Sequence, residues 1–307
     1  MSDYNYSIEA KNVNKIFYKR SKKIKALENF DINIKKGSIH GLLGPNGAGK
    51  STFINILGGL VKKNSGNIKI CGVDIDKNSK LSKFKIGIVP QELNIDPFFS
   101  PIELLELQAG LYGIRKKDRK TDEILHNLKL TDQRNAYART LSGGMRRRLL
   151  IAKALVHSPE MLILDEPTAG VDIDIRTSVW KYIREINSHG TTICLTTHYL
   201  EEAENLCDNI SIINFGRKII ENTKNKLLNI ISNKSVSFII TKDFIIPNEL
   251  LTYNPIKEGS KLSISYDKNK TNLKERIDIL YKNHIDFSEI NTFESDLEDV
   301  FLKVTKG

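Results

Sequence analysis

Runs of apolar residues along the first two thirds of the chain predict a set of short strands. Residues 6–13 and 30–34 alternate polar and apolar side chains, which is typical of antiparallel strands with one solvated face. Shorter, mainly apolar runs predict buried strands at residues 38–43, 86–90, 161–164 and 191–197. The run at 161–164 is continuous, as expected of a central parallel strand that is covered on both faces.

Helical spacing of apolar residues is clearest in the middle of the chain and at its end. Leucines recur at helical intervals in residues 101–130, which predicts a separate helical lobe within about residues 95–160. From about Asn222 the composition shifts toward asparagine, lysine and isoleucine. Two strand-like stretches there precede two helical ones, so we expect one domain over residues 1–221 and a small α+β domain over residues 222–307.

The composition is that of an ordinary globular protein. Of the 307 residues, 40% are hydrophobic and 27% are charged. No apolar run approaches the roughly 20 residues that a membrane-spanning helix needs, and the polar first residues lack the core of a signal peptide. We therefore expect the chain to stay in the cytoplasm. The three cysteines are widely spaced, which favours neither a disulfide framework nor a zinc site.

The formal net charge of +10 leaves two interpretations open. It is compatible with binding to nucleic acid or to an anionic membrane surface. It also fits a biased composition that spreads lysine over a solvated surface, because lysine, asparagine and isoleucine are used heavily throughout the chain. Charge alone therefore assigns no partner.

The clearest candidate for chemistry is a glycine-rich stretch between the strand at 38–43 and an apolar helical stretch that follows it. Its spacing, Gly-x-x-x-x-Gly-Lys-Ser, is that of a phosphate-binding P-loop. The glycines let successive N–H groups turn toward phosphate oxygens, the lysine adds a positive charge, and the serine hydroxyl suits Mg²⁺. The residues of this P-loop are Gly44, Pro45, Asn46, Gly47, Ala48, Gly49, Lys50, Ser51 and Thr52.

Polar side chains also lie where three of the predicted buried strands end. These are Gln91, the pair Asp165 and Glu166, and His198. Ligands of α/β sheets bind at the carboxyl ends of strands, so these side chains are candidates for one site with the P-loop. The Asp is suited to holding Mg²⁺, the Glu to accepting a proton from an attacking water, and the His to orienting a phosphate or that water. Taken singly, Gln91 is more typical of an ordinary loop, two acids at a strand end are often only solvated, and a lone histidine is usually structural.

A second glycine-rich stretch, at residues 141–145, directly precedes another predicted helix. Ser142, Gly143 and Gly144 repeat the arrangement of amide groups at a helix start, but no lysine follows them. The stretch is either one half of a phosphate contact that another surface completes or a plain serine cap. We expect the arginines at 146–148 to form a solvated helix face.

An aromatic pair, Phe17 and Tyr18, lies between the two strands with alternating pattern. An aromatic ring at this place can stack on an adenine base, since every base offers a π-face. The other interpretation is that both rings simply cover the edge of the sheet.

Together, these motifs resemble those of ABC-type ATPases, the nucleotide-binding subunits of ABC transporters, over residues 8–221 and in the family's order. The resemblance implies a P-loop NTPase fold of the ABC class. Such a fold is α/β, with a mixed sheet core, an antiparallel β subdomain and a helical subdomain, and here a small C-terminal α+β module follows it. Residues 44–52 would be the Walker A loop and 141–145 the signature, although Met145 replaces the commonest glutamine.

The resemblance also implies roles for single residues. The catalytic residues would be Glu166, His198 and Gln91, and the residues that hold Mg²⁺ would be Ser51, Gln91 and Asp165. ATP would be bound by the Walker A loop and by Phe17, with Tyr18 as the alternative stacking residue. Contacts to the ATP that an opposite copy holds would come from Ser142, Gly143, Gly144 and the D-loop residue Asp172.

What the resemblance implies for function is an ATP-binding and ATP-hydrolysing subunit. Two copies placed head to tail would bury two ATP molecules between the P-loop of one and the signature of the other. Several stretches, among them 149–168 and 297–302, are similar to type 2 ABC exporters, whose permease is usually a separate membrane chain. We therefore expect an exporter subunit on the cytoplasmic side of the cell membrane, with no nucleic acid as partner. The candidate groove for a cytoplasmic helix of the permease is the loop after Gln91, through Asn94, Asp96, Phe98 and Phe99, unless these residues form an ordinary packed loop.

A second class of function stays open as the alternative. Some ABC ATPases are soluble and act on ribosomes or DNA without transporting anything. Members of that class resemble two cassettes in one chain or carry long coiled-coil insertions, and this sequence has neither. The sequence does not indicate which substrate would be exported.

Overall fold

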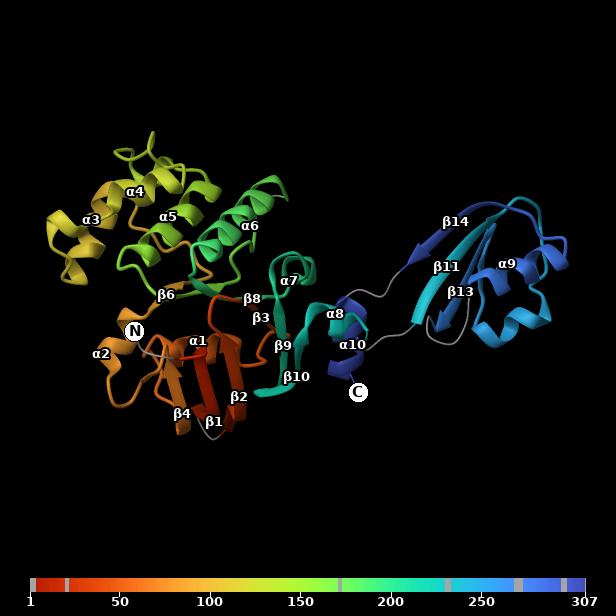
Figure 1. Cartoon of the computed structure of the whole chain (residues 1–307), viewed down its shortest axis with the longest axis horizontal. Coiled ribbons are helices and arrows are strands. Elements are labelled where there is room, and N and C mark those ends of the chain that lie inside the picture. The colour runs from red at the N-terminus through yellow and green to blue at the C-terminus, as the bar shows by residue number, and fades with distance from the viewer. Residues whose placement is uncertain are drawn as a thin grey trace. The chain divides into compact units, whose positions relative to one another are not determined.

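The computed structural model describes residues 4–19, 22–170, 173–229, 233–267, 273–293 and 297–306. Its contacts divide the chain into two compact units, Met1–Lys224 and Asn225–Gly307. Figure 1 shows the secondary structure of both units, and each unit is described by itself.

The first unit is built on a six-stranded sheet with the strand order β10-β9-β3-β8-β7-β6. Neighbouring strands from β9 to β6 are parallel, and β10 is antiparallel to β9. Strands β3, β7 and β8 are buried almost along their whole length, which confirms the expected mixed α/β core. The bounds are β3 (Ile39–Leu43), β6 (Ile86–Val89), β7 (Met161–Asp165), β8 (Thr192–Thr197), β9 (Asn209–Asn214) and β10 (Arg217–Thr223).

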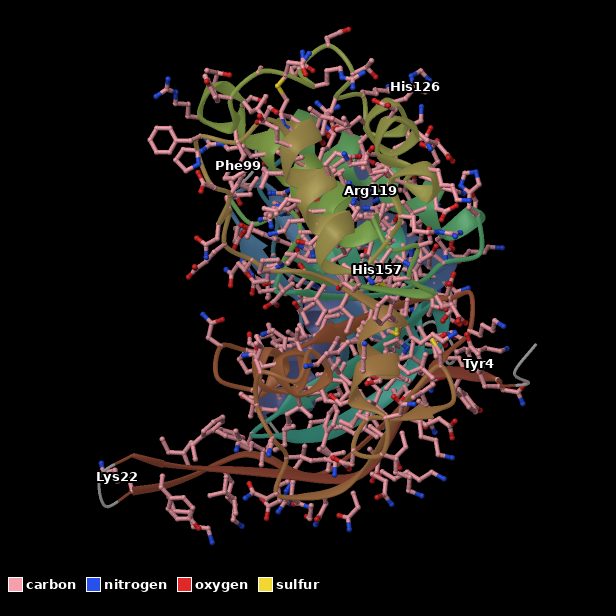
Figure 2. The ribbon with its side chains drawn as sticks, turned by 90° about the vertical axis from the view of Figure 1, so that its left-hand side faces the viewer. Tyr4, Lys22, Phe99, Arg119, His126 and His157 are labelled. Atoms are coloured by element: carbon pink, nitrogen blue, oxygen red, sulfur yellow. The ribbon has the colours of Figure 1, made fainter. Side chains whose placement is uncertain are left out.

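A four-stranded antiparallel sheet, with the order β2-β1-β4-β5, covers one side of this core. Its strands are β1 (Tyr6–Lys19), β2 (Lys22–Lys35), β4 (Ser65–Ile70) and β5 (Val73–Asp74). Strands β1 and β2 form a hairpin longer than the alternation of side chains predicts, because bulges interrupt its register and Asn12 and Asn29 take positive φ angles. Figure 2 shows this hairpin projecting from the body of the unit, with Lys22 at its far end.

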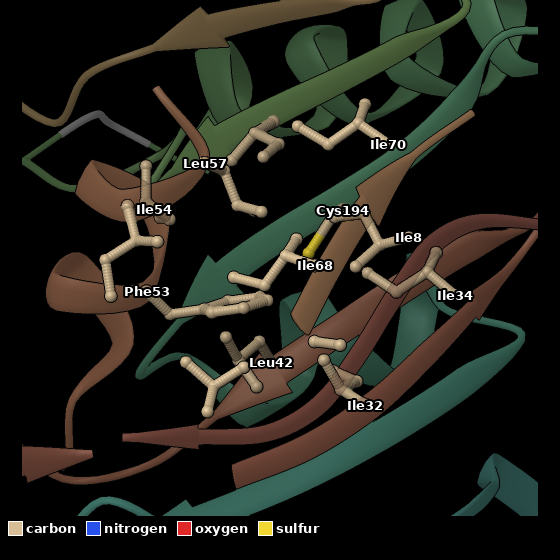
Figure 3. Close-up of a cluster of buried hydrophobic side chains, with 14 of the residues drawn as sticks. Ile8, Ile32, Ile34, Leu42, Phe53, Ile54, Leu57, Ile68, Ile70 and Cys194 are labelled. Carbon is tan, nitrogen blue, oxygen red and sulfur yellow. The ribbon is translucent and has the colours of Figure 1, made fainter. Parts of the chain in front are cut away.

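The space between the two sheets holds helix α1 (Lys50–Leu57) and the main hydrophobic core of the unit. Phe53 of α1 packs against Phe30 of β2, with ring centroids 5.0 Å apart. Figure 3 shows how Ile8, Ile32 and Ile68 from the antiparallel sheet face Leu42 of β3 and the apolar side of α1. The P-loop therefore leads from one buried element, β3, straight into another.

Short helices make up much of residues 95–160. Helix α3 begins at Ser100 with a capping box, in which Ser100 and Glu103 bond each other's backbone amides, and Pro101 occupies its first turn. Besides α1, the helices of the first unit are α2 (Ser79–Phe84), α3 (Pro101–Leu111), α4 (Thr121–Asn127), α5 (Gly143–Leu155), α6 (Ile173–Ser188) and α7 (Leu200–Leu206), and the 3₁₀ helices are Lys116–Asp118 and Ala138–Thr140. The predicted helical stretch at 101–130 is thus two helices joined by a 3₁₀ turn.

The second unit combines a four-stranded antiparallel sheet with helices. The strand order is β12-β13-β11-β14, and Val236, Phe238, Ile264 and Leu280 are fully buried in its core. The elements are β11 (Asn233–Ile240), a 3₁₀ helix (Asn248–Tyr253), β12 (Ile256–Glu258), β13 (Lys261–Asp267), α9 (Leu273–Lys282), β14 (Phe287–Phe293) and α10 (Leu297–Lys306), while α8 (Lys224–Leu228) spans the boundary between the units.

Candidate functional site

A cavity of about 740 Å³ opens at the P-loop in the first unit. It brings together most of the predicted site residues: Phe17, residues 46–52, Gln91, Glu166 and His198. Ile24, Lys25 and Ala26 of β2 complete its wall, and the sequence patterns did not single them out. Residues from five distant parts of the chain therefore meet at one hollow beside a helix start.

The P-loop backbone takes conformations that require glycine. Gly47 and Gly49 have φ angles of 81° and 111°, and a Cβ at Gly49 would lie 2.5 Å from the carbonyl oxygen of Ala26. Gly44 is needed for a different reason, because a Cβ there would lie 2.4 Å from the carbonyl oxygen of Ile213. Gly49 directly precedes α1, so the partial positive charge of this helix N-terminus points at the cavity.

Lys50 is the positive charge that the P-loop itself brings to this cavity, and it is buried at 6% exposure. Its Nζ donates hydrogen bonds to the carbonyl oxygens of Gly44 at 2.6 Å and Pro45 at 3.2 Å. Burial lowers the pKa of Lys50, and the nearby carboxylates of Glu166 and Asp165 act in the opposite direction. The ammonium group is thus held within the loop by carbonyl groups that a phosphate can replace.

The polar side chains at the ends of the three strands meet at Glu166. Gln91 Nε2 donates to Glu166 Oε2 at 2.9 Å, and His198 Nδ1 lies 3.1 Å from the same oxygen. Glu166 is buried and has a φ of 48°, a left-handed conformation that costs on the order of 1–3 kcal/mol in a residue other than glycine. Such a conformation persists where the surroundings impose it, and here the backbone N–H of Glu166 donates to Thr196 of β8.

Asp165 ends β7 beside this group, although it does not line the cavity itself. Its Oδ1 accepts a hydrogen bond from Thr196 Oγ1. Burial raises the pKa of Asp165 and the neighbouring charge of Glu166 adds to this effect, while Thr196, Lys50 and Arg147 lower it. Sequence reasoning missed Thr196; a hydroxyl side chain within a six-residue strand that is buried throughout is the signal that marks it.

The two aromatic candidates differ in their positions. Phe17 lines the cavity and is 37% exposed, whereas Tyr18 is 75% exposed and does not belong to the lining. The ammonium group of Lys15 lies 4.7 Å from the centroid of the Phe17 ring. Of the two rings, Phe17 is the one in reach of a base bound at the P-loop.

The second glycine-rich stretch lies elsewhere. Ser142 caps α5, its Oγ accepting from the backbone N–H of Met145 at 3.3 Å, so the predicted cap is present. Ser142, Gly143 and Gly144 are not part of the cavity lining, and Ser142 and Gly143 are exposed. Asp172, the remaining predicted contact, lies outside the described residues.

The expectation of a solvated arginine face at 146–148 is wrong for Arg147. This side chain is only 2% exposed, and its guanidinium donates to the carbonyl oxygens of Pro90 at 2.9 Å and Gln91 at 3.0 Å. Arg148 is partly buried and donates to the carbonyl oxygen of Leu128 at 2.9 Å. Three successive arginines cannot share one solvated face of a helix, because neighbouring residues are about 100° apart around its axis.

A larger cavity, of about 1020 Å³, lies in the second unit around residues 240–249 and 283–286. Its Lys257 pairs with Asp243 at 3.0 Å and donates to the carbonyl oxygen of Phe244. Lys257 is therefore neutralised within the lining, and the contacts around it do not aim a set of groups at one reacting atom. The chemistry of the chain points to the P-loop cavity.

Comparison with known proteins identifies the family of this chain. The sequence profile of the ABC transporter family matches residues 27–169. The linearmycin resistance ATP-binding protein LnrL of Bacillus subtilis is 34% identical, over 97% of this chain and 98% of its own length. The chain belongs to the ABC transporter family. Nod factor export ATP-binding protein I of Cupriavidus metallidurans is 41% identical, over 66% of this chain and 67% of its own length.

Solved structures of ABC ATPases share the fold of the first unit. The dimeric post-hydrolysis state of the cassette MJ0796, bound to ADP and Pi, is 28% identical with a TM-score of 0.62, over 70% of this chain and 98% of that one. The protein cbiO1 of Clostridium perfringens, part of the ABC transporter complex cbiONQ, is 30% identical with a TM-score of 0.64, over 74% of this chain and 92% of that one. These relationships confirm the predicted ABC fold and identify the chain as an ATP-binding, ATP-hydrolysing member of the family.

Proposed function

We propose that this chain is the ATP-driven motor subunit of an exporter, which works as a head-to-tail pair of copies on a separate membrane permease. The observation that carries the proposal is the division of the nucleotide-binding parts. The P-loop, Gln91, Glu166 and His198 share one cavity, whereas the start of α5 is exposed outside it. A second copy is needed to bring the two parts together.

The relatives support export as the direction of transport. They include ATP-binding proteins of linearmycin resistance, daunorubicin resistance and Nod factor export. Daunorubicin resistance protein DrrA2 of Streptomyces coeruleorubidus is 33% identical over 94% of this chain. None of these names speaks for the alternative of an ATPase that acts on ribosomes or DNA.

The residues of the cavity divide the work of ATP hydrolysis. The amide groups of residues 46–52 and the ammonium of Lys50 bind the phosphates, and Phe17 stacks on the base. Glu166 accepts the proton of the attacking water, and His198 and Gln91 orient Glu166 and the γ-phosphate from either side. Contacts to the γ-phosphate exist only while ATP is intact, so its binding closes the pair of copies and hydrolysis releases them.

The site also fits Mg²⁺ as a cofactor. Within the described residues no three His, Cys, Asp or Glu side chains gather as they would around a metal ion. The donors here are instead the Ser51 hydroxyl, the Asp165 carboxylate and the Gln91 amide, a sparse set of oxygen ligands that suits a cation shared with phosphates. Bound there, Mg²⁺ would neutralise charge on the phosphate oxygens.

The membrane partner is part of the proposal. In the portions of the chain that the structure describes, no helix has the length and apolar character to cross a membrane. We place the protein at the cytoplasmic face of the membrane, held there by the permease. Phe98, which is 68% exposed in the loop that follows Gln91, is a candidate for this contact.

The test of the catalytic assignment is Glu166→Gln. We expect this variant to bind ATP normally, to lose at least about 100-fold in kcat, and to elute as an ATP-bound dimer in size-exclusion chromatography. Glu201→Gln, at an exposed carboxylate of α7, should behave like the wild type. Unchanged hydrolysis in Glu166→Gln would remove this residue from its proposed role.

The test of the transport assignment is the partner that copurifies from solubilised membranes. An exporter subunit should retain a polytopic membrane protein in an ATP-sensitive manner. Recovery of ribosomes in its place contradicts the proposal, whatever the outcome for Glu166.

A further inference from the structure

Arg147 joins the start of α5 to the loop that follows β6. It lies five residues after Ser142, the cap of this helix. Its two terminal nitrogens donate to the carbonyl oxygens of Pro90 and Gln91, at 2.9 and 3.0 Å. A planar guanidinium that holds two successive carbonyl groups fixes the direction of the backbone between them.

The surroundings of Arg147 show that this contact is built into the fold. The side chain is buried at 2% exposure, and burial lowers its pKa, while the carboxylates of Glu202 and Asp165 favour the charged form. A buried guanidinium is stable only where acceptors and opposite charges face it. The two carbonyl groups of the loop are therefore essential partners of this charge.

The contact continues directly to the reacting carboxylate. Gln91, whose backbone Arg147 holds, donates from its side chain to Glu166 Oε2 at 2.9 Å. Two hydrogen bonds and the intervening residue Gln91 thus separate Arg147 from Glu166. Any movement of α5 relative to β6 changes the place of the Gln91 side chain, because a bidentate contact transmits both shift and rotation.

We infer that Arg147 is a positioning residue that links the two ATP sites of the paired copies. The start of α5 contacts the ATP held by the partner copy, and Arg147 transmits this contact to Gln91 and Glu166 of its own copy. The inference rests on the proposed function, since only a head-to-tail pair places α5 on the partner's ATP.

Arg148 provides a matched control for a purely supporting role. It is the next residue on α5, and its guanidinium also holds two successive carbonyl groups, those of Leu128 at 2.9 Å and Lys129 at 3.2 Å. These carbonyl groups belong to Leu128, the C-cap of α4, and to the residue after it, away from the loop at Gln91. Support of α5 is therefore shared by both arginines, but contact with Gln91 belongs to Arg147.

The first experiment compares Arg147→Met and Arg147→Lys with Arg148→Met and Arg148→Lys. For both Arg147 variants we expect kcat for ATP to fall roughly 10-fold, as for other residues that orient a catalytic group, while KM stays within about 2-fold. The Arg148 variants should keep kcat within about 2-fold of the wild type. Equal losses at both positions, or an unchanged kcat in Arg147→Lys, overturn the inference, and the lysine variants retain the charge in case a methionine variant does not fold.

The second experiment asks in which copy Arg147 acts. Pairs are purified through two different tags, and one copy carries Glu166→Gln so that a single site per pair hydrolyses ATP. Arg147→Met is then placed either in the copy with intact Glu166 or in the copy with Glu166→Gln. The rate of the first turnover is measured after Mg²⁺ is added to pairs preloaded with ATP.

The two placements give opposite expectations. Arg147→Met should slow the first turnover roughly 10-fold in the copy with intact Glu166 and change it by less than about 2-fold in the other copy. The reverse pattern, or equal slowing, shows that Arg147 only shapes the helix start and overturns the inference. If the pair without any Arg147 change forms no ATP-bound dimer, the proposed function itself fails, which separates the two outcomes.

Discussion

Two glycine-rich turns start helices in the first unit, and their surroundings differ. The turn before α1 is enclosed: Lys50 is nearly buried, and a Cβ at Gly49 would meet the carbonyl oxygen of Ala26 at 2.5 Å. The turn before α5 is open, since a Cβ at Gly143 would meet nothing within 4 Å. Both helix starts present amide groups and a partial positive charge. The turn before α1 can bind a nucleotide because it is enclosed and has a lysine. The turn before α5 needs another surface to complete a binding site.

Ser142→Asp is the sharpest way to break this comparison. Aspartate caps a helix as well as serine does, so α5 and nucleotide binding by the single copy should be preserved. The added negative charge, however, would face the phosphates of the partner's ATP, where like charges cost several kcal/mol. We expect ATP-driven dimer formation and hydrolysis to fall by at least about 100-fold.

The control for this prediction is Ser142→Asn, which caps α5 equally well and adds no charge. It should retain dimer formation and most of the hydrolysis. If Ser142→Asp dimerises with ATP as the wild type does, measured by size-exclusion chromatography, the open turn has no phosphate to meet. The turn before α5 would then serve only to start the helix, without a role in binding ATP.

Lys50→Ala tests the enclosed turn in the opposite way. Removing the ammonium deletes a charge-assisted contact to phosphate, worth about 1.5–3 kcal/mol, so the affinity of the single copy for ATP should fall roughly 10- to 100-fold. Lys62→Ala, at an exposed lysine beyond α1, should bind ATP normally. Titration with a fluorescent ATP analogue measures both. Equal affinities in the two variants would contradict the assignment of the P-loop.

The enclosed turn could be predicted from sequence, and the open turn only in part. The spacing from Gly44 to Ser51, between a buried strand and a helix, demands the fold that the structure shows. The carboxyl ends of parallel strands share one edge, so Gln91, Glu166 and His198 were expected to meet, and they do. Motif spacing and the positions of strand ends therefore predicted most of the residues that line the cavity.

What sequence reasoning could not supply were side chains whose environment depends on packing between distant elements. Arg147 stands in a run of three arginines, and charge alone suggests water; only the placement of α5 against β6 buries it. The hairpin of β1 and β2 was predicted too short, since its bulges break the alternation on which the prediction depends. A local sequence pattern indicates which residues share one face of an element, but it does not indicate which other element will pack on that face.

Phe17→Ala compares the base end of the cavity with its phosphate end. Stacking on a base contributes about 1–3 kcal/mol, so the affinity for ATP should fall roughly 10-fold, less than in Lys50→Ala. Tyr18→Ala is the matched control, because Tyr18 is the neighbouring ring outside the lining. A larger loss of ATP affinity in Tyr18→Ala than in Phe17→Ala would make Tyr18 the stacking residue. Competition between ATP and inorganic triphosphate separates the base contribution from that of the phosphates.

The smallest expected effect is a change of stability with pH, and it comes from β3, the strand that precedes the P-loop. His40 of β3 is 1% exposed, its Nε2 lies 2.8 Å from Ser211 Oγ, and burial lowers the pKa of His40 from 6.5 to about 4. The unfolded chain takes up this proton near its ordinary pKa while the folded protein does not, so stability decreases as the pH falls from about 7 toward 4. Between pH 7 and 6 the free energy of unfolding should decrease by about 0.7 kcal/mol from His40.

Chemical denaturation at pH 7 and pH 6 measures the change in the free energy of unfolding. His40→Gln keeps a group that can bond Ser211 but does not titrate, so it should flatten the pH dependence. Part of the slope should remain, because burial also lowers the pKa of His157, which follows α5. An equal slope in His40→Gln and the wild type would show that the strand beneath the P-loop tolerates a charge, and that enclosure of this turn does not extend to its support.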